Sequence, residues 1–164
     1  AQAIPGDMFA AWGAGGYEGG PLGYPVEEAK AAGGGYIQKF EKGYLTRNPD
    51  AKKHYMVFGA IGAKYGELGG ASSDLGYPKG NEKKIKGGFF QEFEKGNIYW
   101  SPKTGAHVIY YGAIFDHWGK NGWEQGKFGW PTSDMKEIPT GGLTINFENG
   151  GLDQIFGQVR ERKN

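Results

Sequence analysis

Alternation of apolar and polar side chains predicts a short β-strand at residues 88–94. Successive side chains of a strand point to opposite faces, so every second residue shares a face. The positions that we expect to face the core of this strand are Phe89, Gln91 and Phe93. The same alternation recurs in two other segments, whose core-facing positions are Tyr36, Gln38 and Phe40, and Leu143, Ile145 and Phe147.

Further elements follow from turn residues and spacing. A tight turn at Lys95-Gly96 leads to an expected strand at residues 97–100, and a turn at 101–105 leads to another at 106–111. Ile114 and Trp118 are four positions apart, which predicts a short helix that ends at a glycine. The pattern is therefore helix, turn, then antiparallel strands.

This pattern occurs three times, because a four-residue turn motif recurs at intervals of 53 residues. Its copies are Leu22-Gly23-Tyr24-Pro25, Leu75-Gly76-Tyr77-Pro78 and Phe128-Gly129-Trp130-Pro131. A second marker follows each turn, as Phe40-Glu41-Lys42-Gly43, Phe93-Glu94-Lys95-Gly96 and Phe147-Glu148-Asn149-Gly150. An aromatic residue precedes each turn in register, namely Trp12, Tyr65 and Trp118.

We therefore predict an α+β tandem-repeat domain with three repeats of about 53 residues. Each repeat combines a short helix with a small antiparallel sheet, in an arc or a pseudo-symmetric ring. The boundaries that the markers indicate are 1–58 (repeat 1), 59–111 (repeat 2) and 112–164 (repeat 3). Repeat 3 keeps its strands but loses the later turn and ends in a charged tail, which suits a terminal cap.

Composition narrows the class of protein. Glycine makes up 32 of the 164 residues without a Gly-X-Y period, and 15% of residues are aromatic, which indicates many turns around a core of large rings. The net charge of +1 gives no general attraction to nucleic acid. The absence of cysteine excludes disulfides and thiolate metal sites. No apolar run reaches the length of a membrane span.

The motifs resemble the LGFP-repeat family, whose repeat of about 50 residues contains an L-G-x-P turn. The longest similar segment is "GNIYWSPKTGAHVIYYGAI" at residues 96–114. Repeat 1 keeps the proline, the histidine and Gly-Ala-Ile of this segment but lacks Tyr-Trp. The resemblance implies a secreted or cell-envelope protein without a catalytic domain, which binds cell-wall or extracellular polysaccharide and needs no cofactor.

Candidate ligand-binding aromatics are those that the repeat itself does not require. Tyr99, Trp100 and Trp123 have no aromatic counterpart among the repeat markers, so packing demanded by the repeat does not explain them. Aromatic rings offer flat apolar faces that suit sugars. Trp12, Tyr65 and Trp118 are instead expected in the core.

His107 is a further candidate, and His54 is its counterpart. The structural alternative is that its ring nitrogens fix the turn through hydrogen bonds. No partner for histidine catalysis is signalled, and the spacing of His54, His107 and His117 does not favour a metal site.

Gln38 and Gln91 lie on the expected core face, where a buried amide needs partners, so they are candidates for lining a cleft between repeats. The recurrent glutamates, which are Glu41, Glu94 and Glu148, are expected to accept backbone N–H bonds at their own turns.

Three functions remain open on this evidence. The first is non-enzymatic binding of polysaccharide. The second is a lectin-like or toxin-like effector that recognises foreign glycans. The third is a glycan hydrolase with a cleft between repeats, which would need two carboxylates facing each other.

Overall fold

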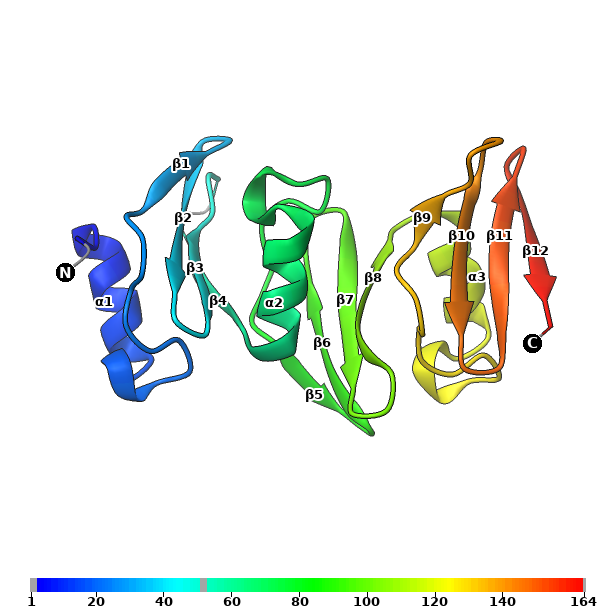
Figure 1. The fold of residues 1–164 in the computed structure, drawn as a ribbon, viewed down its shortest axis with the longest axis horizontal. Coiled ribbons are helices and arrows are strands. Elements are labelled where there is room, and N and C mark those ends of the chain that lie inside the picture. Colours follow the sequence, from blue (N-terminus) through cyan, green and yellow to red (C-terminus); the bar gives the residue numbers. More distant parts are fainter. Residues whose placement is uncertain (1–2, 51–52, 164) are drawn as a thin grey trace. The chain divides into compact units, whose positions relative to one another are not determined.

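The computed structural model describes residues 3–50 and 53–163 (Figure 1). One α-helix, one short 3₁₀ helix and four strands follow one another three times along the chain. The α-helices are α1 (Gly6–Ala14), α2 (Gly59–Leu68) and α3 (Ala113–Lys120). The 3₁₀ helices are η1 (Tyr17–Gly19), η2 (Gly70–Ser72) and η3 (Trp123–Gln125).

Each repeat contains a four-stranded sheet in which strands pair in chain order. The strands of repeat 1 are β1 (Lys30–Ala32), β2 (Gly35–Phe40), β3 (Gly43–Arg47) and β4 (His54–Phe58). Those of repeat 2 are β5 (Lys83–Ile85), β6 (Gly88–Glu92), β7 (Gly96–Ser101) and β8 (Gly105–Tyr110). Those of repeat 3 are β9 (Lys136–Glu137), β10 (Leu143–Phe147), β11 (Gly150–Ile155) and β12 (Gln158–Arg162). The α+β repeat fold is confirmed, and an arc or ring stays a prediction.

The chain forms two compact units whose boundary runs through repeat 2. The first unit contains Ala1–Lys83 and Gln91–Glu94, and the second contains Lys84–Phe90 and Lys95–Asn164. In the first unit, α2 packs on β3 and β4 of repeat 1. In the second unit, α3 packs on β11 and β12 of repeat 3.

The recurring aromatic residue of each helix holds the turn motif by a hydrogen bond. Its ring nitrogen or hydroxyl donates to the carbonyl of the turn glycine, 11 residues further along the chain. The pairs are Trp12 with Gly23 (3.1 Å), Tyr65 with Gly76 (2.8 Å) and Trp118 with Gly129 (3.1 Å). This bond explains why the position holds tryptophan or tyrosine, since phenylalanine has no donor.

The same rings pack against the phenylalanine of the second marker. The centroids are 5.8 Å apart for Trp12 and Phe40, 4.9 Å for Tyr65 and Phe93, and 5.1 Å for Trp118 and Phe147. All six side chains are buried, so the expected core role of the helix aromatics is confirmed.

The recurrent glutamate closes the turn from the other side. Glu94 Oε1 accepts the N–H of Tyr77 (2.8 Å), and the Glu94 N–H donates to the Tyr77 carbonyl (3.0 Å). Glu41 and Glu148 repeat both bonds, as expected from the sequence. Gly76 has φ of +79°, and a β-carbon there would collide with the Glu94 carboxylate, so only glycine suits the position.

The expected core face of the central strands is mostly confirmed. Phe93, Ile145 and both glutamines are buried. Tyr36 differs, because 38% of it is exposed. It lies at the start of β2, where the Arg47 guanidinium stacks over its ring at 5.7 Å.

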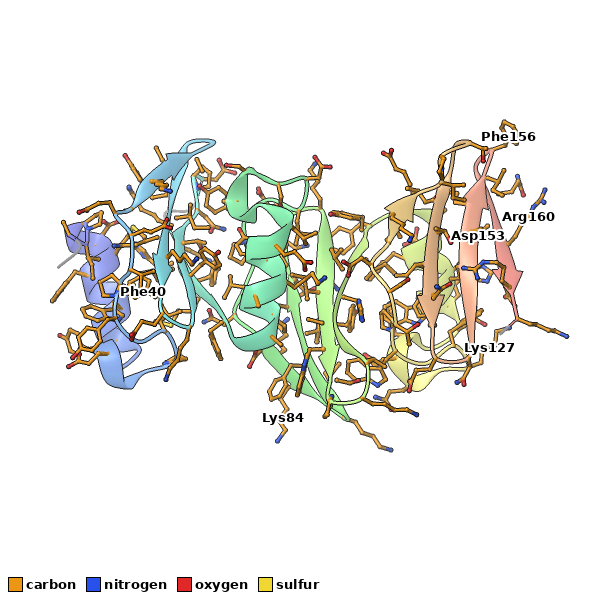
Figure 2. The ribbon with its side chains drawn as sticks, viewed as in Figure 1. Phe40, Lys84, Lys127, Asp153, Phe156 and Arg160 are labelled. Carbon is orange, nitrogen blue, oxygen red and sulfur yellow. The ribbon has the colours of Figure 1, made fainter. Side chains whose placement is uncertain are left out.

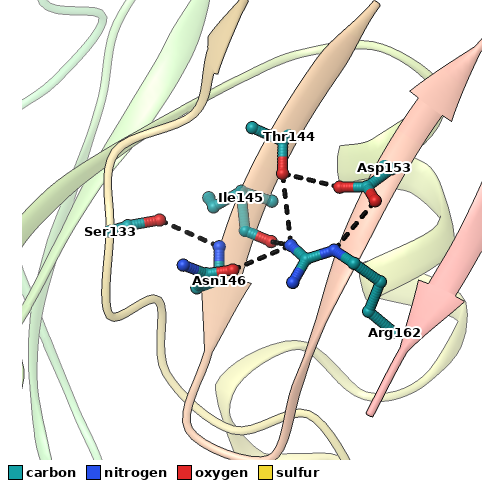
Figure 3. A network of polar contacts seen from close by, with 6 residues as sticks. All are labelled: Ser133, Thr144, Ile145, Asn146, Asp153 and Arg162. Atoms are coloured by element: carbon teal, nitrogen blue, oxygen red, sulfur yellow. Dashed lines mark hydrogen bonds and ion pairs between the residues drawn. The ribbon is translucent and has the colours of Figure 1, made fainter. Parts of the chain in front are cut away.

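The charged tail of repeat 3 forms an element that was not expected from the sequence, because residues 158–162 are strand β12, paired with β11. The outer face of this sheet is polar (Figure 3). Arg162 donates to the Asp153 carboxylate (2.8 Å) and the Asn146 side chain (2.7 Å), and Asp153 also accepts a bond from Thr144. Arg162 lies flat over Gly151, where any β-carbon would collide with the guanidinium.

Two kinds of short element were not expected. The first strand of each sheet has only two or three residues, and its alternation is too short to recognise. Each 3₁₀ helix follows a left-handed glycine at the end of the preceding helical segment. None of the helices within the described residues is long and apolar enough to cross a membrane.

We predict that Tyr65→Phe lowers the free energy of unfolding by about 1–2 kcal/mol, because it leaves the partly buried Gly76 carbonyl without its partner. Tyr65→Trp should keep the hydrogen bond, as in the other two repeats. Urea unfolding at pH 7 measures both changes. Tyr36→Phe is the matched control, and an equal loss in that variant would contradict the explanation.

The same variants have a defined pH dependence. Burial raises the pKa of the Tyr65 hydroxyl, and the nearby Tyr77 and Glu94 add to this effect. Neutral Tyr65 therefore stabilises the fold fully below the ordinary tyrosine pKa of about 10. Its contribution is lost as pH rises above that value, since the unfolded chain ionises first. Tyr65→Phe should flatten the alkaline part of a stability profile relative to Tyr36→Phe.

Candidate functional site

Trp123 is an exposed aromatic residue held in an unusual backbone conformation. It begins η3 with φ of +52°, and 45% of its surface is exposed. A bulky residue in the left-handed region costs about 1–3 kcal/mol and persists where its surroundings enforce it. Such an outlier on an exposed ring points to a role outside the core.

The fold supports the Trp123 ring from beneath. The ring lies on Gly119 of α3, so closely that a β-carbon there would come within 2.9 Å of it. Phe115, one turn earlier on α3, places its ring centroid 6.5 Å from that of Trp123. We call Phe115 and Trp123 the repeat 3 platform.

Repeat 1 has an equivalent platform, which the sequence interpretation missed. Tyr17 begins η1 with φ of +54°, is 46% exposed, and lies on Gly13 of α1. Phe9 is 5.8 Å from it, between ring centroids. We call Phe9 and Tyr17 the repeat 1 platform. The expectation that Trp123 has no counterpart is therefore wrong.

The counterpart was hidden because repeat 2 breaks the pattern. Gly62 and Gly70 occupy the two platform positions there, 53 residues before Phe115 and Trp123. Gly70 keeps the left-handed conformation, with φ of +62°. The Tyr44 hydroxyl, from β3, covers the helix glycine Gly66 instead. A comparison of repeats 1 and 3 alone would have revealed the platforms.

Tyr99 and Trp100 lie on opposite faces of β7. Tyr99 is buried in the core of the second unit, edge-on to Trp118 with centroids 4.9 Å apart. Trp100 is partly exposed and packs beside Phe89 at 5.8 Å. Tyr99 is therefore placed to stabilise the core, and only Trp100 presents a surface.

His107 fixes the turn that precedes β8. Its Nε2 lies 2.7 Å from the Thr104 carbonyl, and its Nδ1 lies 3.2 Å from Asp134 Oδ1. The same Asp134 oxygen accepts the N–H of Val108. This arrangement matches the structural interpretation of His107.

The other two histidines make ion pairs with separate carboxylates. His54 pairs with Asp7 at 3.1 Å, and His117 pairs with Glu161 at 2.8 Å. Burial alone would raise the pKa of Asp7, but the hydrogen bond with His54 and the charge of Arg47 hold it below its ordinary value. In the described part of the chain, no cluster of three or more histidines and carboxylates could hold a metal ion.

Gln38 and Gln91 act as matching links within the first unit. The Gln38 amide nitrogen donates to the carbonyls of Ala3 and Glu27, and that of Gln91 donates to those of Met56 and Gly80. Each acceptor of Gln91 lies 53 residues after the equivalent acceptor of Gln38. Each buried amide connects the segment that precedes an α-helix to the segment that follows the next turn motif. Because both glutamine side chains are buried, neither is accessible to a ligand.

The six candidates from the sequence therefore do not form one site. Tyr99 and the two glutamines are internal, and His107 belongs to a turn. Trp100 and Trp123 remain on the surface of the second unit. The arrangement with the clearest capacity to bind is the platform that repeats 1 and 3 each carry. In each platform, two aromatic rings lie side by side on a helix.

The family model of the LGFP repeat matches the chain twice, at residues 22–73 and 75–126. Each match begins at the turn motif and includes a whole sheet, the next α-helix and its 3₁₀ helix. A search of curated proteins finds no match. The two matched segments together span more than half of the sequence, so the chain belongs to the LGFP-repeat family.

Proposed function

We propose that this protein is a non-enzymatic module that binds cell-wall or extracellular polysaccharide through its aromatic platforms. The observation that carries the proposal is the pair of exposed rings, Tyr17 and Trp123, in matching left-handed positions. Each is supported by a helix glycine that leaves room for the ring. A secreted or cell-envelope location belongs to the same proposal.

Platform geometry suits a sugar better than it suits a purely apolar ligand. Tyrosine and tryptophan combine an apolar face with a polar edge, so they can pack on the C–H face of a sugar and bond to its hydroxyls. The strained backbone and the underlying glycine hold the ring before binding. Less side-chain entropy is then lost when a ligand arrives.

Repetition supports a polymer as the ligand. Repeats 1 and 3 each carry one platform, and a polysaccharide offers many equivalent sugars to both. Weak binding at each platform is strengthened when a single chain occupies two of them.

The recurrent glutamates favour binding over hydrolysis. A glycosidase needs two carboxylates poised across a substrate. Glu41, Glu94 and Glu148 each use one carboxylate oxygen to hold a turn of the scaffold. The described residues contain no feature that favours the hydrolase over the binding module.

We predict that Tyr17→Gly and Trp123→Gly each change the free energy of unfolding by no more than about 1.5 kcal/mol. Glycine relieves the left-handed strain while the variant loses ring packing, so the two effects oppose each other. Gly70 shows that the fold accepts glycine at this position. Urea unfolding measures the change, and collapse of either variant would show that the rings are structural.

The same variants test binding. In a pull-down on isolated cell-wall polysaccharide, each single variant should bind about five- to tenfold more weakly, and the double variant should lose retention. Phe156→Asn is the matched control, because Phe156 is 99% exposed at a hairpin tip outside the platforms (Figure 2). Asparagine tolerates the left-handed backbone there.

Two results would count against this function. If the folded protein is not retained on any wall fraction, the module does not bind wall polysaccharide. A glycan array then tests the effector alternative, which requires binding to foreign glycans. If the double variant is retained as well as the parent protein, binding does not use the platforms.

A further inference from the structure

A cleft of about 890 Å³ lies in the first compact unit, between the sheet of repeat 1 and α2. A smaller cleft of about 280 Å³ lies beside η2. The two share Lys39, Tyr44 and Gly66 in their linings, and we treat them together as one groove along the helix. We call this groove the α2 cleft. It contains neither platform.

Repeat 2 has glycine at the two positions where the other repeats have platform rings, and both glycines line the α2 cleft. Gly62 lines the larger cleft and Gly70 lines the smaller one. In the second unit, Phe115 and Trp123 occupy these positions, and Gln125 of η3 also donates to the Lys86 carbonyl. The same scaffold therefore presents a groove in one unit and two rings in the other.

Two unpaired ammonium groups line this groove. Lys39 and Lys42 are exposed, and neither makes an ion pair with any residue in the described ranges 3–50 and 53–163. The carboxylates in the lining have partners. Glu41 holds the Tyr24 N–H at 2.9 Å, and Glu67 pairs with Lys64 at 2.7 Å.

Tyr44 lines both clefts, and its ring is held in place by packing. Its ring packs edge-on against the buried Tyr65, with centroids 6.0 Å apart. Its hydroxyl lies over Gly66 and has no hydrogen-bond partner within the described chain. A rigid hydroxyl in a cleft that two ammonium groups also line can bond to a ligand without reorganisation.

We propose that the α2 cleft binds an oligosaccharide that carries a carboxylate or phosphate group. This inference goes beyond the proposed function, because it assigns a second site with a different ligand preference. Lys39 and Lys42 form charge-assisted hydrogen bonds with the anionic group. The Tyr44 hydroxyl and the second oxygen of Glu41 bond to sugar hydroxyls.

The lining favours an acidic sugar over a nucleic acid. Nucleic-acid sites combine many cations with flat rings on which bases stack. This groove has two free ammonium groups beside the Glu41 carboxylate, and the Tyr44 ring is packed against Tyr65. A ligand that carries one anionic group and several hydroxyls is complementary to these lining groups.

The test is a calorimetric titration of the whole protein at low salt with three short oligosaccharides. These are a hexamer of galacturonic acid, a glycerol phosphate oligomer that carries glucose, and neutral maltohexaose. At least one anionic ligand should bind about tenfold more tightly than the neutral one and weaken as salt is raised. The stronger of the two anionic ligands identifies carboxylate or phosphate as the preferred group.

Two variants locate the site. Lys39→Gln/Lys42→Gln should weaken anionic binding by about tenfold or more. Lys84→Gln/Lys86→Gln is the matched control and should bind as the parent does, since both lysines are exposed outside the cleft, with Lys84 projecting from β5 (Figure 2). Ala63→Phe, an exposed helix position that lines the cleft, should block it without changing any charge.

The platform double variant, Tyr17→Gly/Trp123→Gly, keeps this proposal separate from the previous one. This variant should no longer be retained on wall polysaccharide, but it should bind the short anionic oligosaccharide as the parent protein does. The inference is overturned if neither anionic ligand binds more tightly than maltohexaose. It is also overturned if both the lysine variant and Ala63→Phe, confirmed as folded by urea unfolding, bind as the parent does.

Discussion

The structure depends on how each turn glycine is held. Its carbonyl accepts a bond from the helix aromatic residue, and its neighbour exchanges two bonds with the recurrent glutamate. These bonds connect the helix, the turn and the second strand of each repeat. Because they form within a sequence separation of about 17 residues, a repeat can assemble these contacts before distant parts of the chain meet.

The repeat period, the main strands and the helices could be predicted from the sequence, since they follow from alternation, glycine placement and a strict spacing. The role of Glu94 could be predicted for the same reason. The tail of repeat 3 could not, because Gln158–Arg162 is almost entirely polar as an edge strand. Its pairing depends on β11, which no local pattern reveals.

The candidate site was harder to predict than the fold. Tyr99 and Trp100 are adjacent in the sequence, so their side chains point to opposite faces of β7. Which face is buried depends on how β7 pairs within its sheet, and in the structure it is the face of Tyr99. Trp123 was found as an exposed candidate, but its relation to Tyr17 was obscured by Gly70. A comparison between neighbouring repeats asks whether the same residue type recurs at a position. The position of Trp123 instead requires a left-handed backbone, which glycine adopts freely and an aromatic residue adopts under strain.

Two positions hold aromatic residues in repeats 1 and 3 and glycine in repeat 2, and the surface of the repeats differs there. Phe115 and Trp123 place their ring centroids 6.5 Å apart, and Gly62 and Gly70, at the same positions of the preceding repeat, line the α2 cleft. Repeats with the same order of elements thus carry different surfaces. The exchange also involves the backbone, because a β-carbon at Gly62 would lie 2.7 Å from the carbonyl oxygen of Val57.

The Arg162 network also bears on how separate molecules meet in solution. The sheet of repeat 1 accepts α2 on an outer face that includes Tyr44, whereas the corresponding face of repeat 3 carries a guanidinium bonded to Asp153 and Asn146. A neighbouring molecule that docked a helix there would have to strip water from this charged group without supplying a partner. The network therefore disfavours the docking of an apolar helix of a second molecule on this face of repeat 3.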